Sequence, residues 1–272
     1  FIIMEQSEYP PMSGSNTICV VTVLLETGVL PMIEPVTKLT LEAPAGLIEV
    51  SATCHNGKVE KVEFLNVPAF AVHTDVPLEI PGYSTVTVDI AWGGMFFVIA
   101  DAAQFDIDPV AGAGSAIVQA GEAMRTAAAE QYPVVHPHNP DIQGPTISQL
   151  TAPANQAGTD GRGAIVVSSG DYRAGTISGA LDRSPCGTGT CAKMAVLHKK
   201  GLLDVGQSYV NAGPLGTTFT GRIESLTRVG DYEAVVPTLS GQGWIAGVSQ
   251  YLVDPSDPFQ HGFTVGDIWA SQ

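Results

Sequence analysis

The sequence predicts an α/β (α+β) protein built from two similar halves that face each other across one site. Three observations predict this fold class: many short apolar runs bounded by glycine, proline or asparagine, a few helical segments, and one segment that recurs 173 residues later. The chain has 272 residues, of which 30 are glycine and 19 are proline, and this composition indicates many turns between short strands. A chain of this length can bury a full core without disulfide bonds.

The strands are predicted by runs rich in valine, isoleucine and threonine, because β-branched side chains fit a half-buried pleated surface. Between two of these runs, Asn56-Gly57 tolerates the positive φ angles of a tight hairpin turn. One long helix is expected after Asp108-Pro109, because small and apolar residues recur there at helical spacing until Pro133. The predicted strands cover residues 45–53, 58–65, 84–90, 96–100, 163–168, 208–210 and 233–237.

Two shorter helices come from the repeat. Placing Ser13 on Cys186 aligns residues 13–17 with 186–190 without a gap, and it also places Gly28 on Gly201. Each segment has a tight glycine turn, a helix of about twelve residues, and a glycine at the position where a left-handed residue ends helices. We interpret the repeat as an internal duplication that produced two related halves.

The turn at Cys186 is a candidate catalytic site. A short side chain with a thiol or hydroxyl, followed by glycine at the start of a helix, lies beside unpaired backbone N–H groups and the positive end of the helix dipole. This environment lowers the pKa of a thiol, so Cys186 is expected to be a thiolate near neutral pH. The amides of Gly187 and Thr188 could hold an anionic substrate group.

The related turn offers Ser13, with the amides of Gly14 and Ser15, and Asp182 precedes the cysteine by four residues and could receive an ammonium group. Arg183 either pairs with Asp182 or points to solvent. Taken singly, these residues have plainer explanations. A cysteine before a helix is often simply buried, a serine there is usually an N-cap, and an aspartate is usually solvated. Their combination in two related turns favours a shared site for a small zwitterion.

The segment 182–190 (DRSPCGTGT) resembles the proline racemase superfamily, which contains proline racemases, 4-hydroxyproline 2-epimerases and trans-3-hydroxy-L-proline dehydratases. The resemblance extends over nearly the whole chain, through residues 44–47, 66–70, 92–97 and 262–263. It implies two similar domains as in diaminopimelate epimerase, each with a curved sheet around a central helix. The substrate would lie between the domains, and no cofactor or metal is expected.

The resemblance also implies a domain division. A first domain would span residues 1–71 and be completed by 245–272, and a second would span 72–244. We expect that an N-terminal part of the first domain is missing. The resemblance also implies the roles of the site residues. Cys186 would be an acid/base group, and Asp182 would bind the ring nitrogen of the substrate. The substrate carboxylate would be bound by the backbone amides of Gly187, Thr188, Gly14 and Ser15.

At 13–16 the chain has Ser-Gly-Ser-Asn, whereas racemases of this superfamily carry Cys-Gly-His. The Ser13/Cys186 pair resembles the branch with trans-3-hydroxy-L-proline dehydratases, although some epimerases also use it. A hydroxyl is a much weaker acid than a thiol, and dehydration tolerates such an unequal pair better than racemisation does. The predicted function is therefore dehydration of trans-3-hydroxy-L-proline to Δ1-pyrroline-2-carboxylate. The alternative is 4-hydroxyproline 2-epimerase or proline racemase, and which residue takes the α-proton stays open.

Other classes of protein fit the sequence less well. A net charge of −15 argues against nucleic acid or a membrane surface as a partner. His136 and His138 lack the spacing of zinc ligands. The Gly-x-Gly segments at 112–114 and 161–163 lack the further glycine, or the Lys-Ser/Thr pair, that a phosphate-binding loop needs. A catalytically inactive module that binds proline-like ligands is the non-enzyme alternative. We expect reduced thiols, a cytoplasmic protein without a transmembrane span, and a possible homodimer.

Overall fold

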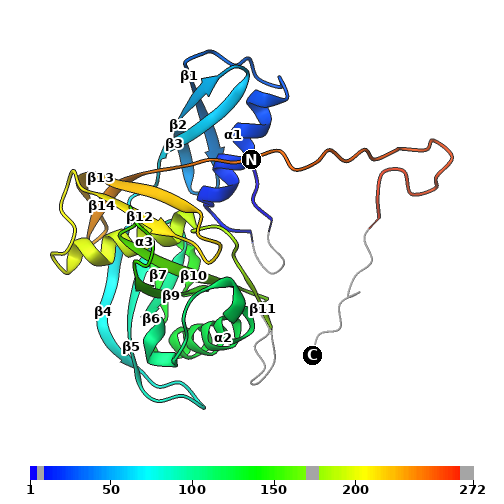
Figure 1. Cartoon of the computed structure of the whole chain (residues 1–272). Coiled ribbons are helices and arrows are strands. Elements are labelled where there is room, and N and C mark those ends of the chain that lie inside the picture. The colour runs from blue at the N-terminus through cyan, green and yellow to red at the C-terminus, as the bar shows by residue number, and fades with distance from the viewer. Residues whose placement is uncertain (5–8, 170–177, 264–272) are drawn as a thin grey trace.

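The computed structural model describes residues 1–4, 9–169 and 178–263 (Figure 1). Most of this chain forms one 12-stranded sheet in the order β1-β2-β3-β14-β13-β12-β10-β9-β6-β5-β4, with β11 beside β10. The helices are α1 (Gly14–Glu26), α2 (Gly114–Gln131) and α3 (Gly187–Lys199). The strands of the sheet are β1 (Val36–Ala43), β2 (Gly46–His55), β3 (Lys58–Leu65), β4 (Phe70–Leu78), β5 (Val86–Trp92), β6 (Phe96–Asp101), β9 (Ile147–Pro153), β10 (Gly161–Ser168), β11 (Gly179–Leu181), β12 (Ser208–Ala212), β13 (Thr218–Val229) and β14 (Tyr232–Gly241).

Two hydrophobic cores lie on this curved sheet, each with its own helix. The first core joins α1 to β1–β3, β13 and β14, around Ile18, Phe64 and Leu239. The second core joins α2 to β4–β6, β9 and β10, around Ile117 and Met124. The two helices lie at opposite ends of the molecule in Figure 1. A short hairpin of β7 (Val134–His136) and β8 (Asn139–Gly144) lies beside the main sheet, packing near Trp92.

Helix α3 lies between the two cores and contributes to both ends of the molecule. Its Cys191 and Met194 are in the first core, whereas Ala192 and Val196 pack on β5, β6, β9 and β10. Because side chains alternate across a strand, β9 and β10 present one face to α3 and the other face to α2. This part of the sheet is therefore covered by a helix on each side and is buried.

The predicted fold class is confirmed, and so is the local structure of the repeat. Helices α1 and α3 each have 13 residues and begin and end 173 residues apart. Gly28 and Gly201 follow them with φ angles of 74° and 69°, the left-handed conformation that ends a helix. Asn56 and Gly57 also have positive φ angles of 50° and 73°, as the predicted hairpin turn requires. The seven predicted strands all lie within observed strands or overlap them.

The sequence prediction missed several strands, each for a physical reason. The pairing of β13 with β14 shifts register between Ile223 and Ser225, which interrupts the alternation of buried and exposed residues. The pairing of β4 with β5 shifts twice and leaves a polar stretch. In β9, Ser148 and Gln149 are fully buried, so the run lacks the apolar signal of a buried strand.

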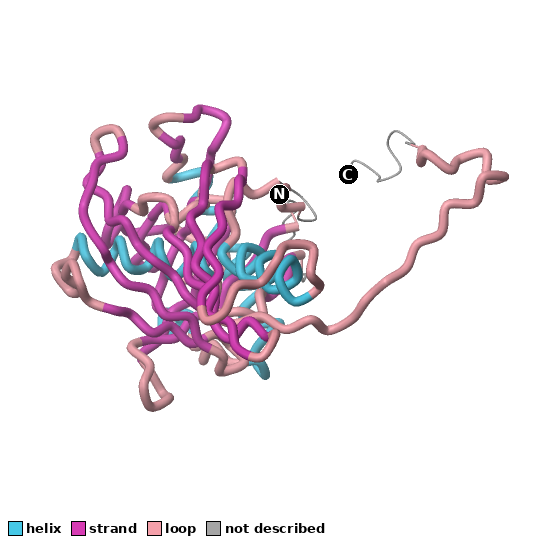
Figure 2. The backbone as a smooth tube through the Cα atoms, turned by 90° about the horizontal axis from the view of Figure 1, so that it is seen from above, coloured by secondary structure: helices cyan, strands magenta, loops and turns pink. Residues whose placement is uncertain are grey.

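The division into domains 1–71 plus 245–272 and 72–244 stays a prediction. Strand β14 pairs with β3, and Ala69 forms a bridge with Val235, so the sheet continues from one half into the other. Residues 242–263 contain no helix or strand and extend away from the body of the molecule (Figures 1 and 2). Residues 264–272 of the predicted domain lie outside the described part of the chain. Among the described residues, no helix combines the length and the apolar character needed to cross a membrane.

Candidate active site

The two glycine turns of the repeat meet face to face. A Cβ atom placed on Gly14 would lie 2.8 Å from the Cα of Gly187, and one placed on Gly187 would lie 2.6 Å from the Cα of Gly14. A side chain at either position would clash with the facing backbone, so only glycine lets the first turns of α1 and α3 approach this closely. Leu239 of β14 supports both turns from below. The tertiary fold thus brings together two segments that are 173 residues apart.

Both turns use the candidate catalytic side chain as the N-cap of the helix. The Oγ of Ser13 accepts hydrogen bonds from the backbone N–H of Asn16, at 3.4 Å, and from its Nδ2, at 2.9 Å. The Sγ of Cys186 accepts a hydrogen bond from the backbone N–H of Gly189 at 3.3 Å. The cysteine has a φ angle of 61°, which is unfavourable for a residue with a side chain, whereas Ser13 is extended. Backbone strain of this kind concentrates at functional sites.

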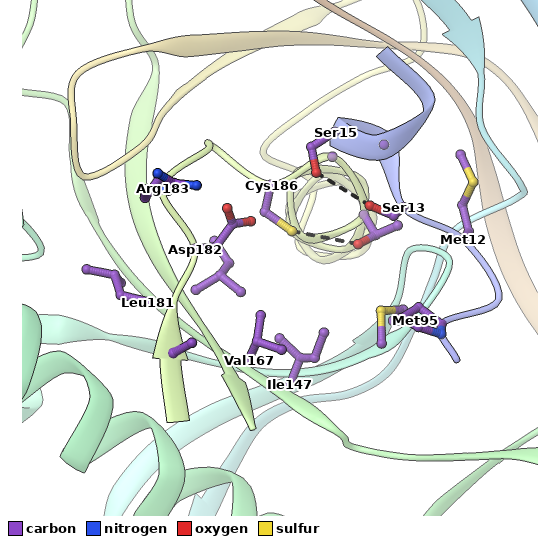
Figure 3. A pocket seen from close by; sticks show the side chains of 16 residues that line it. Met12, Ser13, Ser15, Met95, Ile147, Val167, Leu181, Asp182, Arg183 and Cys186 are labelled. Carbon is purple, nitrogen blue, oxygen red and sulfur yellow. Dashed lines mark hydrogen bonds between the residues drawn. The ribbon is translucent and has the colours of Figure 1, made fainter. Parts of the chain in front are cut away.

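One cavity of about 240 Å³ lies between the turns. Its volume equals that of roughly eight liquid water molecules, so it suits a small amino acid. Figure 3 shows the side chains of Ser13, Asp182 and Cys186 around the same space. The remainder of the wall is mostly apolar. All seven predicted site residues line the cavity: Ser13, Gly14, Ser15, Asp182, Cys186, Gly187 and Thr188.

Asp182 follows directly after β11 and is held in place by its own turn. Its Oδ1 accepts a hydrogen bond from the backbone N–H of Ser184 at 2.8 Å, and its Oδ2 accepts one from the Ser184 hydroxyl at 3.0 Å. The Ser184 Oγ in turn accepts a hydrogen bond from the N–H of Cys186 at 3.0 Å. Burial raises the pKa of Asp182, while the Ser184 hydrogen bonds and the charge of Arg183 act in the opposite direction. Arg183 itself is exposed at the edge of the cavity.

The expectation that Cys186 is a thiolate near neutral pH is wrong for this structure. Burial raises the pKa of the Cys186 thiol to about 12, and the nearby negative charge of Asp182 adds to the rise. Hydrogen bonds from Gly189 and from Thr188 lower the pKa, as a helix N-terminus should, but they are outweighed. The sequence showed the helix start but not the apolar surroundings. The neutral thiol is therefore the favoured form at pH 7.

Sequence reasoning missed two parts of the site. The first is Ser184, which links Asp182 to the cysteine turn; an aspartate two residues before a serine was the available signal, because such pairs form compact local turns. The second is the apolar wall opposite the turns. Met95 is buried in the core and also lines the cavity. The wall residues come from several distant segments: Met12, Met95, Ile147, Ile165, Val167 and Leu181.

The histidines singled out in the sequence lie elsewhere. The ring centre of His136 lies 4.7 Å from that of Trp92 and 6.0 Å from that of Phe70, in an aromatic cluster whose residues do not line the cavity between the turns. Burial lowers the pKa of His136, and the neighbouring His138 adds to this. In the described ranges, no three His, Cys, Asp or Glu side chains are grouped so that they could hold a metal ion.

The fold and the site define a class of protein. Two opposed helix N-termini, each capped by a side chain that can carry a proton, enclose a small cavity suited to acid–base chemistry on a zwitterion. The chain belongs to the proline racemase family, whose model matches residues 1–264. It is therefore a member of an enzyme family.

Two solved structures are similar over almost the whole chain. A probable proline racemase from Agrobacterium radiobacter K84, with bound carbonate, is 35% identical, with a TM-score of 0.85 over 99% of this chain and 76% of its own. A hydroxyproline epimerase from Agrobacterium vitis, with bound trans-4-hydroxy-L-proline, is 33% identical, with a TM-score of 0.85 over 100% of this chain and 75% of its own. A Bacillus anthracis phenazine biosynthesis protein of the PhzF family, at 10% identity and a TM-score of 0.53, shares the fold over 86% of this chain and 74% of its own.

Proposed function

We propose that the protein removes the α-proton of a hydroxyproline and eliminates its 3-hydroxyl, converting trans-3-hydroxy-L-proline to Δ1-pyrroline-2-carboxylate and water. The observation that carries the proposal is the pair of unequal proton carriers, a serine hydroxyl and a cysteine thiol, at two facing helix N-termini around one cavity. In this arrangement the amides of Gly14, Ser15, Gly187 and Thr188 hold the substrate carboxylate. The ring nitrogen, which is a cation, pairs with Asp182.

The hydrogen bonds of Ser13 suit it to be the proton donor. Its oxygen accepts hydrogen bonds from the backbone and side-chain N–H groups of Asn16, and the Ser15 hydroxyl lies 3.4 Å away. These contacts stabilise a partial negative charge on the oxygen and leave the hydroxyl proton for the substrate. Since neither neighbour is a base, Ser13 is poorly placed to remove a proton. We therefore assign removal of the α-proton to Cys186.

Asp182 explains how a buried thiol can act as that base. Burial raises the pKa of Cys186 most, and the negative charge of Asp182 adds to the rise. When the substrate's ammonium group pairs with Asp182, the charge is neutralised and the pKa of the thiol falls. Substrate binding therefore favours the thiolate at the point where the α-proton must be removed, and the helix amides keep the negative charge on sulfur stable.

The proposed reaction is balanced without a cofactor. The thiolate of Cys186 takes the α-proton, and the electron pair left on the α-carbon forms a double bond to C3 as the C3–O bond breaks. In the trans isomer the 3-hydroxyl lies on the same face of the ring as the α-proton, so the thiol of Cys186 returns its proton to the leaving hydroxyl, which departs as water. Ser13, on the opposite face, gives its proton to C3 of the enamine, and the ring nitrogen of the resulting cyclic imine releases a proton that returns to Ser13 through solvent.

A second candidate is 4-hydroxyproline 2-epimerase, because the similar Agrobacterium vitis protein is a hydroxyproline epimerase with trans-4-hydroxy-L-proline bound. In that reaction Cys186 and Ser13 exchange protons with opposite faces of the α-carbon, and nothing is eliminated. The serine then has to act as a base in one direction, which its hydrogen bonds disfavour.

Product analysis in deuterated water separates the candidates. The protein is incubated with trans-3-hydroxy-L-proline, trans-4-hydroxy-L-proline and L-proline, and the products are followed by NMR and mass spectrometry. Imine acid from the first substrate supports the dehydratase. Inversion at C2 of 4-hydroxyproline with deuterium uptake, and no imine, supports the epimerase. Unchanged substrates without deuterium would contradict both, and a Cys186→Ala variant controls for contaminating activity.

A further inference from the structure

A second cavity lies along α3, on the same face of the sheet as the catalytic cavity. It has a volume of about 390 Å³ and shares no lining residue with the catalytic cavity. On β9, Ile147 lines the catalytic cavity, Thr151 lines the second one, and Gln149 is buried between them on the same face of the strand. Lys193 and Leu197 of α3, and Lys200 at its C-cap, line the second cavity at helical spacing. We call it the α3 cavity.

The two lysines of the α3 cavity differ in their partners. Lys200 is neutralised, because its Nζ lies 2.8 Å from Oδ1 of Asp75 and 2.7 Å from Oδ1 of Asp89. Lys193 is half-buried, yet among the residues that the structure describes its Nζ has neither an ion pair nor a hydrogen bond. Burial lowers the pKa of Lys193, while the charges of Asp89, Asp101 and Asp75 oppose this and the charge of Lys200 adds to it. None of these carboxylates is in direct contact with the Nζ of Lys193 within the described residues, so a partly buried ammonium group gains from an anion that binds to it directly.

The lining of the α3 cavity also carries two carboxylates that are only partly used in hydrogen bonds. Among the described residues, Asp101 accepts a hydrogen bond only through Oδ1, from the N–H of Ala103, and Asp160 only through Oδ2, from the N–H of Val210. Both aspartates are exposed and line the cavity. Within this part of the chain, their other oxygens can accept hydrogen bonds from an ammonium group. Gln104, Thr151 and Tyr209 add polar groups to the same lining.

We propose that the α3 cavity binds a second small molecule, a zwitterionic amino acid whose carboxylate pairs with Lys193 and whose ammonium group lies toward Asp101 and Asp160. Four aspartates and two lysines leave the cavity negative, so it disfavours an anion with two charges. The positive charge of Lys193 repels a simple cation from its own side of the cavity, whereas a zwitterion can place its carboxylate there. The volume equals that of roughly thirteen liquid water molecules, which leaves room for an amino acid with a polar side chain.

Helix α3 connects the α3 cavity to the turn at Cys186, so ligand binding at the cavity could alter the surroundings of the thiol. The helix carries Lys193 on its second turn and begins at the Cys186 cap, and Gly189 lies against both Cys186 and the buried Gln149. The amide atoms of Gln149 have no hydrogen-bond partner within the described structure. A small movement of α3 on ligand binding would therefore change the packing beside the thiol. The α3 cavity is an effector site in this proposal, and it does not depend on which reaction the protein catalyses.

The test is binding of L-glutamine, L-threonine and trans-4-hydroxy-L-proline by isothermal titration calorimetry, with acetate and methylamine as single-charge controls. The matched variants are Lys193→Met and, as control, Lys199→Met, which removes an exposed lysine from the same helix. We expect at least one zwitterion to bind the wild type and the Lys199→Met variant equally, and Lys193→Met to bind it at least tenfold more weakly. Circular dichroism confirms that each variant is folded.

The Asp182→Asn variant distinguishes binding at the α3 cavity from binding at the catalytic cavity, so failure of this proposal can be told from failure of the proposed function. Loss of binding in Asp182→Asn but not in Lys193→Met would place the ligand in the catalytic cavity alone and overturn the proposal. So would binding of none of the three zwitterions at 20 mM, or equal binding of acetate. Reductive methylation followed by mass spectrometry gives an independent measurement, because the bound amino acid should protect Lys193 and leave Lys199 reactive.

Discussion

At the scale of single residues, the site depends on how charges and hydrogen bonds adjust two weak proton carriers. Cys186 is buried beside the carboxylate of Asp182, and both features oppose the thiolate. Ser13 has no basic neighbour among its hydrogen-bond partners, Ser15 and Asn16. In the proposed mechanism the ammonium group of the substrate neutralises Asp182, so the thiolate forms only when the site is occupied.

This account predicts the reactivity of the thiol. Because the pKa of Cys186 is about 12, its alkylation by iodoacetamide should be slow at pH 7 and should rise about tenfold per pH unit up to pH 10. Asp182→Asn removes a negative charge that raises this pKa, so the pKa falls and alkylation at pH 8 becomes faster. Mass spectrometry measures the rate, with the exposed Cys19 as internal reference and the exposed Asp141→Asn as control. An unchanged or slower rate in Asp182→Asn would refute the electrostatic coupling.

Ser13→Ala tests the assigned proton donor. The variant loses the hydroxyl and leaves the Asn16 N–H groups without their acceptor, so we expect kcat to fall at least about a hundredfold. Stability should fall by only about 1 kcal/mol, the usual contribution of an N-cap. Ser15→Ala is the matched control, because it keeps the backbone amide and should keep most of the activity. Similar losses in both variants would show that the serine hydroxyl has no special role.

At the scale of elements, the glycine turns allow two helix N-termini to meet. A Cβ on Gly14 would lie 2.8 Å from the facing backbone, a contact that forces α1 and α3 apart. The two helices would then no longer direct their amides into one small cavity. The turns are thus a requirement of the site's geometry as well as of local backbone conformation.

Gly14→Ala should therefore reduce activity sharply and lower the free energy of unfolding by about 1–3 kcal/mol, the range for overpacking. Gly112→Ala is the control, since a Cβ there meets no atom within 4 Å. Steady-state kinetics and urea denaturation measure the two effects. Full activity of Gly14→Ala would show that the turns do not need to be in contact.

At the scale of the whole molecule, β14 joins the halves and supports the site. Leu239 pairs in register with Phe64 of β3 and with Gly221 of β13, and it is fully buried beneath both glycine turns. The same side chain therefore belongs to the first core and to the floor of the catalytic turns.

Leu239→Ala should lower the free energy of unfolding by about 2–5 kcal/mol, because the cavity that it leaves cannot close fully. It should also reduce activity, since the turns lose their support. Leu226→Ala, at a half-exposed position on the neighbouring strand, should change stability by less than about 0.5 kcal/mol. Urea denaturation followed by circular dichroism compares the two. Equal stability of both variants would contradict this view of β14.

The sequence by itself determined the local structure: two related glycine turns, the helices of equal length that follow them, and the glycines that end those helices. These features depend on neighbouring residues, so the pattern of the chain contains them. Only the tertiary structure decided that Gly14 meets Gly187, that apolar residues from distant strands close the cavity, and that Cys186 is held as a thiol. Burial and cavity shape arise from long-range contacts, and a pKa follows the surroundings of a group more than its position in a helix.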